Sequence, residues 1–364
     1  MNTKKSGRVF CITFMLLFGG GFLLCLFMPK AEYLYSERRM PAPAPELSAD
    51  AVKSGRFMED FDDFAVDAFP FRENFRKIKS YTAGKIFGRR DNNGIYAADG
   101  YISAMEYPMN EDSLEHAADR FRYVCEKYLT DKNKVYLSVI PDKNCFLAKE
   151  SGHLSMDYAE FEQQMAAKLD FAEYIPVSDL LELDDYYKTD PHWRQEKIMD
   201  VARRLAQSMN AALSQDYEIH MLEQDFYGAY YGQAALPAAP DRMQYMMTEA
   251  VKKCKAYDWQ NQKEIPVYDL EKAAGRDPYE MFLSGSLSLI TINNPAAAGK
   301  KLVIFRDSFG SSIAPLLISG YSQITLVDIR YIHPDFLEKF IDFGDSDVLF
   351  LYSTLVLNNS DTIR

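Results

Sequence analysis

The chain has 364 residues, of which 48% are hydrophobic and 14% aromatic, so it can bury a sizeable core and is not a disordered protein. Its formal net charge of −12 at pH 7 argues against binding to nucleic acid through a basic surface. Because the sequence contains no glycine-rich phosphate loop, no cysteine pair at zinc-ligand spacing and no EF-hand pattern, we expect neither a cofactor nor a metal site.

An apolar segment follows a short basic N-terminus. Lys4, Lys5 and Arg8 precede the uncharged residues 9–28, which as a helix would span about 30 Å, the hydrocarbon thickness of a bilayer. A cleaved signal peptide begins in the same way, but no small-x-small cleavage site follows this segment. We therefore predict an uncleaved single-pass anchor in the cell membrane, with residues 1–8 in the cytoplasm and the main domain outside the cell.

The next part of the chain is predicted to connect this anchor to the main domain. Residues 29–55 include a stretch rich in proline and alanine, residues 41–50, which is typical of an extended stalk. The main domain is expected to occupy residues 56–364. Within it, aromatic and charged residues at roughly helical spacing predict helices in 56–90, and two turn signals predict a β-hairpin at 93–102.

Helices and apolar strands then alternate along the chain. The predicted helices are at residues 111–129, 161–169, 194–213 and 311–321. The main predicted strands lie near residues 135–140, 301–305, 324–328 and 348–351, with a short one after residue 173. This alternation predicts an α/β fold with a mainly parallel sheet and helices on both faces.

Ser308 lies where one of these strands should turn sharply into a helix. Catalytic groups of such sheets lie beyond the carboxyl ends of the strands, as do Ser308 and the segments 141–143 and 188–193 in this prediction. A strand-to-helix turn exposes a hydroxyl and leaves backbone N–H groups that can hold an oxyanion. The alternative is that Ser308 only caps the helix.

The loop "KTDPHW" supplies two further groups for acyl chemistry. A serine nucleophile needs a base, usually histidine, and the histidine needs a carboxylate to fix its tautomer. Asp190 and His192 are two residues apart, and Pro191 restricts the backbone between them. We therefore predict a triad of Ser308, His192 and Asp190. A metallohydrolase that uses Asp190 and His192 as ligands would need at least one more acid or histidine.

Together, "YYKTDPHW" and "KKLVIFRDSFGSSIAPLL" resemble the bacterial DHHW proteins, which are relatives of the alginate O-acetyltransferase proteins of the SGNH-hydrolase type. The resemblance covers roughly residues 60–360, and Asp190, His192 and Ser308 match the family's triad by position. The chain departs from the family in two places. Pro191 stands where the family has a first histidine, and Ser286 stands where we expect an asparagine of the oxyanion loop.

The resemblance implies an SGNH-hydrolase-like domain outside the cytoplasm that acts on a cell-surface or exported polysaccharide. Ser308 would take an acetyl group from a membrane-bound O-acyltransferase and pass it to a sugar hydroxyl, or to water if the protein is an acetylesterase. The oxyanion loop would contribute Gly285 and Ser286. The alternative is a catalytically inactive, membrane-anchored scaffold or glycan-binding protein of a polysaccharide-modification assembly. Aromatic rings near the motifs could stack on sugar rings or belong to the core. They are Trp193, Tyr227, Tyr230 and Tyr231.

Overall fold

The computed structural model divides the chain into two compact units. It describes residues 3–34, 36–37, 39–297 and 299–364. The N-terminal unit holds residues up to 92 together with 235–237, and the large unit holds residues 93–234 and 238–364. This boundary lies downstream of residue 56, at which the sequence prediction begins the main domain.

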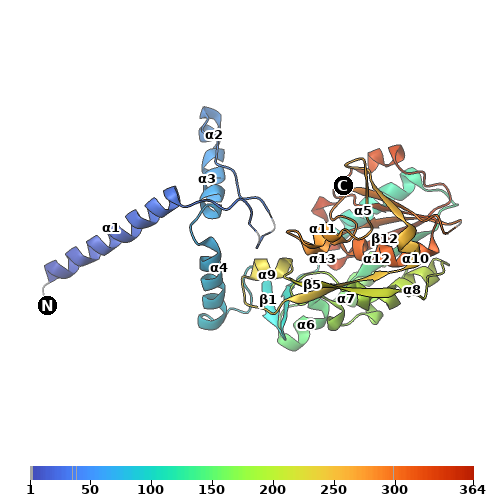
Figure 1. Cartoon of the computed structure of the whole chain (residues 1–364), viewed down its shortest axis with the longest axis horizontal. Helices are drawn as coiled ribbons and strands as arrows, with labels where there is room; N and C mark the ends of the chain where they lie inside the picture. Colours follow the sequence, from blue (N-terminus) through green and yellow to red (C-terminus); the bar gives the residue numbers. More distant parts are fainter. Residues whose placement is uncertain (1–2, 35, 38, 298) are drawn as a thin grey trace. The chain divides into compact units, whose positions relative to one another are not determined.

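Helices make up most of the described part of the N-terminal unit (Figure 1). It contains α1 (Thr3–Phe27), α2 (Ala49–Ser54), α3 (Arg56–Asp67), α4 (Arg72–Tyr81) and a π-helical turn, η1 (Thr82–Ile86). Within α1, the stretch Gly7–Cys25 is long and apolar enough to cross a membrane, and both an anchor and a signal sequence would fit this description. The helices expected in residues 56–90 are confirmed, and residues 40–48 have no regular secondary structure.

The large unit is built around one eight-stranded sheet. Its strands are β3 (Val135–Ile140), β4 (Glu173–Tyr174), β7 (Lys255–Asp258), β8 (Lys263–Ile265), β9 (Leu289–Asn293), β10 (Lys301–Arg306), β11 (Gln323–Val327) and β12 (Asp347–Ser353). In the order β4-β3-β12-β10-β11-β9-β7-β8, the first five strands are parallel, and β9, β7 and β8 extend the sheet with antiparallel pairings. The four main predicted strands are confirmed as β3, β10, β11 and β12. The expectation of a mainly parallel sheet agrees with the five parallel strands, and the antiparallel strands β9, β7 and β8, which make the sheet mixed, were not predicted.

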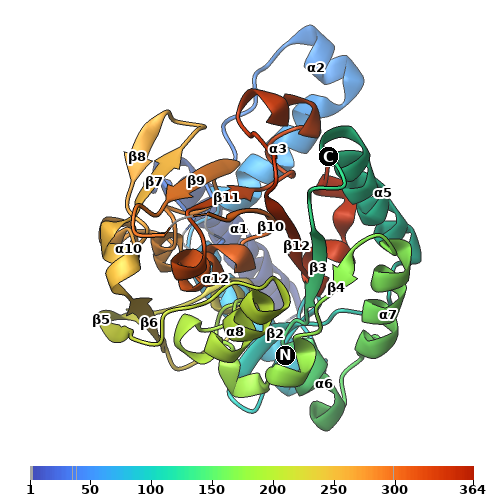
Figure 2. The same cartoon turned by 90° about the vertical axis from the view of Figure 1, so that its right-hand side faces the viewer.

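The central strands are apolar on both sides because helices cover both faces. Leu302 and Ile304 of β10 pack with α8 (Met199–Ser208) and α12 (Phe309–Leu317), whereas Val303 and Phe305 pack with α5 (Glu111–Tyr128) and α7 (Tyr158–Lys168). Figure 2 shows α5 and α7 on one side of β3 and β12, and α8 and α12 on the other. The predicted covering of both faces is therefore confirmed.

Side chains at the helix starts account for two of the helix boundaries. The Asn110 side chain accepts a hydrogen bond from the Ser113 N–H at the start of α5, and the Asp157 side chain accepts one from the Glu160 N–H at the start of α7. The helix predicted at 194–213 is shorter than expected. Its first residues form the 3₁₀ turn η4 (Gln195–Lys197), since the buried Gln195 side chain turns inward to donate to the Ser312 carbonyl.

Two small antiparallel pairs and several short helices complete the large unit. The predicted hairpin is confirmed as β1 (Ile95–Ala98) with β2 (Tyr101–Ala104), and a second pair joins β5 (Glu218–Phe226) to β6 (Asp241–Met247). The remaining short helices are α6 (Asn144–Ser151), α9 (Ala229–Ala234), α10 (Glu249–Lys253), α11 (Leu270–Ala273) and α13 (Thr354–Leu357). The remaining 3₁₀ turns are η2 (Ser178–Leu180), η3 (Leu183–Asp185), η5 (Pro278–Met281), η6 (Ile318–Gly320), η7 (Pro334–Lys339) and η8 (Ser360–Thr362).

Candidate active site

Ser308, His192 and Asp190 meet beyond the carboxyl end of β10. Ser308 Oγ lies 2.7 Å from His192 Nε2, and His192 Nδ1 lies 2.5 Å from Asp190 Oδ1. Asp190 is completely buried, while Ser308 is half-buried and therefore reachable from solvent. In this arrangement the imidazole can take the serine proton while the carboxylate holds the ring by its other nitrogen.

The Ser308 hydroxyl does not cap the helix that follows it. Ser308 is the N-cap residue of α12, but its side chain makes no capping hydrogen bond. The buried carboxylate of Asp307 accepts from the Phe309 N–H at 3.0 Å instead, and its second oxygen accepts from the N–H and hydroxyl of Ser353 on the neighbouring strand β12. Asp307 therefore fixes the turn and leaves the Ser308 hydroxyl to His192.

Asp190 is held by the first residue of α9. Its Oδ2 accepts from the Ala229 N–H at 2.9 Å, and its Oδ1 accepts from the His192 N–H at 3.2 Å as well as from the ring. Next to Ala229, Gly228 lies so close that a Cβ placed on it would be 2.2 Å from Asp190 Cβ. The site therefore requires glycine at position 228.

A second buried carboxylate, Asp241 of β6, fixes the backbone of the same loop. It accepts from the Lys188 N–H at 2.7 Å, from the Thr189 N–H at 2.8 Å and from the Thr189 hydroxyl at 2.6 Å. Thr189 in turn accepts from the Gly228 N–H at 2.9 Å. These bonds connect the loop to β6 on one side and to the segment before α9 on the other. The position of Asp190 is therefore set from both sides.

Lys143 follows β3 in the sequence and contacts the backbone of the loop that carries Asp190 and His192. Its buried ammonium donates to the Ile102 carbonyl at 2.6 Å, to the Tyr187 carbonyl at 2.7 Å and to the Lys188 carbonyl at 3.3 Å. Burial lowers the pKa of Lys143 to about 7, and neighbouring carboxylates, Asp190 foremost, oppose this shift. Lys143 thus connects the β1–β2 hairpin to the loop that carries the histidine.

The ring of His192 rests on the ring of Tyr279. The two ring centroids are 3.8 Å apart with an interplanar angle of 9°, and the Phe309 ring lies 4.9 Å from the His192 ring. The Tyr279 hydroxyl donates to Ser312 Oγ at 2.9 Å, so the tyrosine is itself fixed to α12. Tyr279 belongs to no motif, so the sequence does not predict its place beside His192.

Two of the aromatic residues considered for sugar stacking are not available for it. Trp193 is completely buried and donates from its ring to Ser312 Oγ at 2.8 Å, and Tyr230 is also buried. This part of the prediction is corrected: both rings belong to the core. Tyr227 is exposed and Tyr231 half-buried, with their ring centroids 4.6 Å apart, so these two remain candidates.

The predicted oxyanion loop lies near the end of β10. The Leu287 carbonyl accepts from Arg306 Nη2 at 3.3 Å, and Ser286 is exposed. The backbone is left-handed over three consecutive residues, with φ of 55° at Leu283, 59° at Ser284 and 96° at Gly285. The Gly285 N–H already donates to the Phe282 carbonyl at 3.3 Å, so an oxyanion would have to compete with that bond.

Among the described residues, no group of three or more histidine, cysteine, aspartate or glutamate side chains could hold a metal ion. The further ligand that a metallohydrolase would need beside Asp190 and His192 is therefore missing from this part of the chain.

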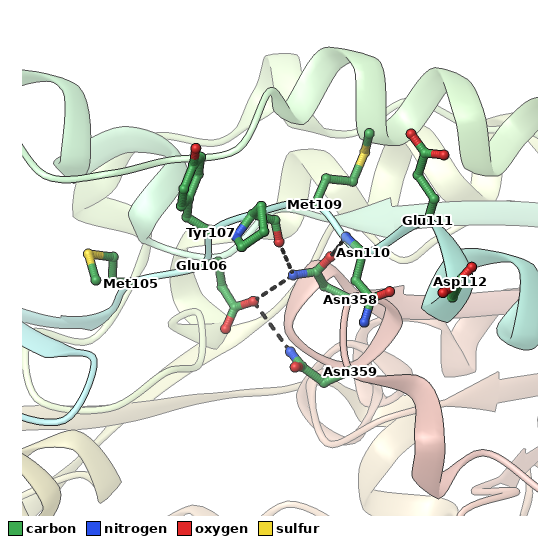
Figure 3. Close-up of a pocket in the computed structure, with 10 residues that line it drawn as sticks. Met105, Glu106, Tyr107, Met109, Asn110, Glu111, Asp112, Asn358 and Asn359 are labelled. Atoms are coloured by element: carbon green, nitrogen blue, oxygen red, sulfur yellow. Dashed lines mark hydrogen bonds between the residues drawn. The ribbon is translucent and has the colours of Figure 1, made fainter.

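A hollow of about 640 Å³ lies elsewhere on the large unit, and no triad residue lines it (Figure 3). Figure 3 shows Glu106 turned toward two amides: Asn358 donates to its Oε2 at 3.2 Å and Asn359 at 3.4 Å. Burial, with Asp142 nearby, raises the pKa of Glu106. The hollow and the triad are separate features of the large unit.

The large unit has a mixed α/β fold, with serine, histidine and aspartate together beyond the carboxyl end of β10. This arrangement agrees with the resemblance of the motifs to DHHW proteins. No protein-family model and no curated protein sequence matches the chain. Among solved structures, a DHHW family protein from Eubacterium siraeum is similar at 21% identity and a TM-score of 0.61, over 75% of this chain and 95% of that chain. Bacillus cereus PatB1 with a sulfonyl adduct is similar at 18% identity and a TM-score of 0.57, over 72% of this chain and 95% of that chain. The predicted resemblance to DHHW proteins is thus confirmed, and the likeness establishes the fold.

Proposed function

We propose that the large unit is an acyl-ester enzyme with an SGNH-hydrolase-like domain, in which Ser308 is the nucleophile, His192 the base and Asp190 the orienting carboxylate. The observation that carries the proposal is the 2.7 Å separation of Ser308 Oγ and His192 Nε2. A catalytically inactive scaffold would not require these atoms within hydrogen-bond reach, so this geometry favours the enzyme.

The proposed reaction has two steps. Ser308 Oγ attacks the acyl carbonyl carbon while its proton passes to His192 Nε2. The C–O bond to the leaving group then breaks, and that oxygen takes the proton, which leaves an acyl-serine. In the second step His192 removes a proton from a sugar hydroxyl or from water, and that oxygen attacks the acyl-serine. The bond to Ser308 Oγ then breaks, and the proton returns to the serine.

The negative charge on the acyl oxygen would be held at the start of α12. The backbone N–H of Ser308 is the proposed first donor, and the positive end of the helix dipole favours an anion there. Gly285 or Ser286 would supply the second donor if their loop released the Gly285–Phe282 bond.

The substrate and partner follow from the DHHW resemblance. We infer that the acyl group is acetyl, that the acceptor is a cell-surface or exported polysaccharide, and that a membrane-bound O-acyltransferase is the donor. Tyr227 and Tyr231 are the aromatic residues that remain for contact with a sugar ring. Transfer and hydrolysis differ only in whether a sugar hydroxyl or water attacks the acyl-serine.

The apolar helix would place this enzyme at the outer face of the cell membrane. We propose residues 9–28 as an uncleaved anchor, residues 29–55 as a stalk and residues 56–364 as the extracellular part. Protease added to intact cells should then remove nearly the whole chain, whereas digestion only after lysis would contradict this topology.

A sulfonyl fluoride tests the nucleophile directly. If Ser308 is activated, its Oγ displaces fluoride from the sulfur and forms a sulfonyl ester, which mass spectrometry of the full-length protein locates. We expect the adduct on Ser308, with none in the Ser308→Ala protein and strongly reduced labelling in His192→Ala. Ser322→Ala, next to the opposite end of the neighbouring strand β11, is the matched control and should label normally. Equal labelling of the parent and Ser308→Ala proteins would exclude Ser308 as the nucleophile.

A further inference from the structure

The segment from residue 72 to residue 90 differs in charge from the rest of the chain. It contains seven basic residues and one acidic residue, a formal charge of +6 in a chain whose net charge is −12. The preceding helix α3 has the opposite character, with five acidic residues and one basic residue. Two adjacent helices of the N-terminal unit therefore carry charges of opposite sign.

The basic segment also exposes a row of large apolar side chains. Phe75 and Ile78 are three positions apart and therefore share a side of α4, while Phe71 directly precedes α4 and Ile86 is the last residue of η1. Their exposed fractions are 54%, 54%, 60% and 68%, respectively. A helix that packs against a protein core would bury such a row.

Another side of the same segment is partly buried and makes hydrogen bonds within the N-terminal unit. Arg72, Arg76, Ser80 and Ala83 share a side at helical spacing, and Ser80 and Ala83 are buried. Arg72 donates to Glu37 at 2.6 Å, and Arg76 donates to Ser36 at 2.8 Å. The segment is therefore attached to its own unit by its polar side, which leaves the apolar row outward.

Exposed basic residues stand next to these apolar residues in the sequence. Lys77, Lys79 and Lys85 are exposed and lie among the apolar positions of the segment. Long lysine side chains can keep their ammonium groups in water while their stems follow an apolar surface. Lysine is depleted at protein–protein interfaces, whereas a helix with an apolar side and many basic residues is typical of membrane surfaces.

From these observations we propose that α4 and η1, residues 72–86, lie in the interface of an anionic lipid membrane. Phe71, Phe75, Ile78 and Ile86 would enter the boundary between headgroups and acyl chains, and the lysines would contact lipid phosphates. The acidic helix α3 would stay in solvent. This membrane contact is distinct from any insertion of α1 and does not depend on the function of Ser308.

Quenching by brominated lipids tests the proposal on the full-length protein in nanodiscs. A Phe75→Trp variant introduces a reporter on the apolar row, and Phe61→Trp on α3 is the matched control, since Phe61 is also exposed. Emission is compared with that of the parent protein, which contains Trp193 and Trp259. In nanodiscs of brominated phosphatidylglycerol we expect strong quenching and a blue shift for Phe75→Trp, and little change for Phe61→Trp.

The charge requirement is tested in the same system. Brominated phosphatidylcholine in place of phosphatidylglycerol should weaken the quenching of Phe75→Trp, as should Lys77→Gln, Lys79→Gln and Lys85→Gln combined. Each lysine at an anionic surface changes the association constant by roughly fivefold. Equal quenching of the two reporters, or quenching that ignores lipid charge, would overturn the proposal. So would a blue shift that appears in detergent and grows with protein concentration, which would indicate a second copy on this surface.

Discussion

Gly228 touches the backbone of Asp190 so closely that a Cβ at position 228 would lie 2.4 Å from Asp190 Cα and 2.2 Å from its Cβ. Real Cβ atoms do not approach other atoms this closely, so a larger residue at position 228 must displace the loop that carries Asp190 and His192. Since Asp190 aligns the imidazole, that displacement should reach Ser308 through the ring.

Gly228→Ala should therefore lower turnover of an activated acetyl ester by about 10²-fold, because a misplacement of 1 Å can cost that much. Thermal unfolding should also shift to lower temperature. The control is Gly84→Ala, since a Cβ there meets no atom within 4 Å. A Gly228→Ala protein with parent-like turnover would show that Asp190 does not need this close packing.

The triad makes a sharper kinetic prediction. Ser308→Ala and His192→Ala should each lower esterase turnover by about 10³-fold or more, with the circular dichroism spectrum and melting temperature retained. Asp190→Asn should lose most activity too, because an amide beside Nδ1 favours the wrong tautomer. Ser322→Ala should match the parent protein. Unchanged turnover in Ser308→Ala would leave the hydroxyl without a catalytic role.

The parts of the site that could be predicted from the sequence are those with a local signature. Asp190 and His192 are neighbours in one loop, and Ser308 follows an apolar strand directly, so the motif and the strand pattern suffice to predict them. A strand that is buried throughout, such as β12, appears in the sequence as a continuous apolar run, and such a run predicts a buried strand.

The parts that could not be predicted depend on contacts between distant segments. Tyr279 and Asp241 carry no motif, and only the fold brings them to the loop. The ring nitrogen of Trp193 donates a hydrogen bond to Ser312, which is 119 residues further along the chain. This contact holds the ring in the core. The antiparallel edge was missed because β7 and β8 have four and three residues, too few to show a period.

Tyr279 should act through the imidazole that it supports. Tyr279→Phe keeps the ring under His192 and loses the bond to Ser312, so we expect about 1 kcal/mol less stability and nearly parent turnover. Tyr279→Ala removes the ring from a buried site and should cost about 3–5 kcal/mol, together with most of the activity. Denaturant unfolding and ester turnover distinguish the two variants. Equal turnover in both would show that stacking does not position His192.

Lys143 should make the stability of the large unit depend on pH. Burial lowers its pKa from 10.5 to about 7 in the folded protein, while in the unfolded chain the lysine keeps its ordinary pKa. Between these two values the unfolded chain binds more protons than the folded one, so this group adds stability as pH rises from about 7 toward 10.5. Below pH 7 both states are protonated, and the buried charge keeps its full cost.

The matched variant is Lys143→Met, which fills similar space without a titrating group. The free energy of unfolding, measured in denaturant from pH 7.5 to 9.5, should rise more steeply with pH in the parent protein than in Lys143→Met. Lys143→Met should also lower ester turnover, because the carbonyls of Tyr187 and Lys188 lose the donor that holds the histidine loop. Parallel pH dependences for the two proteins would mean that the Lys143 ammonium stays protonated across this range, held by its three carbonyl acceptors.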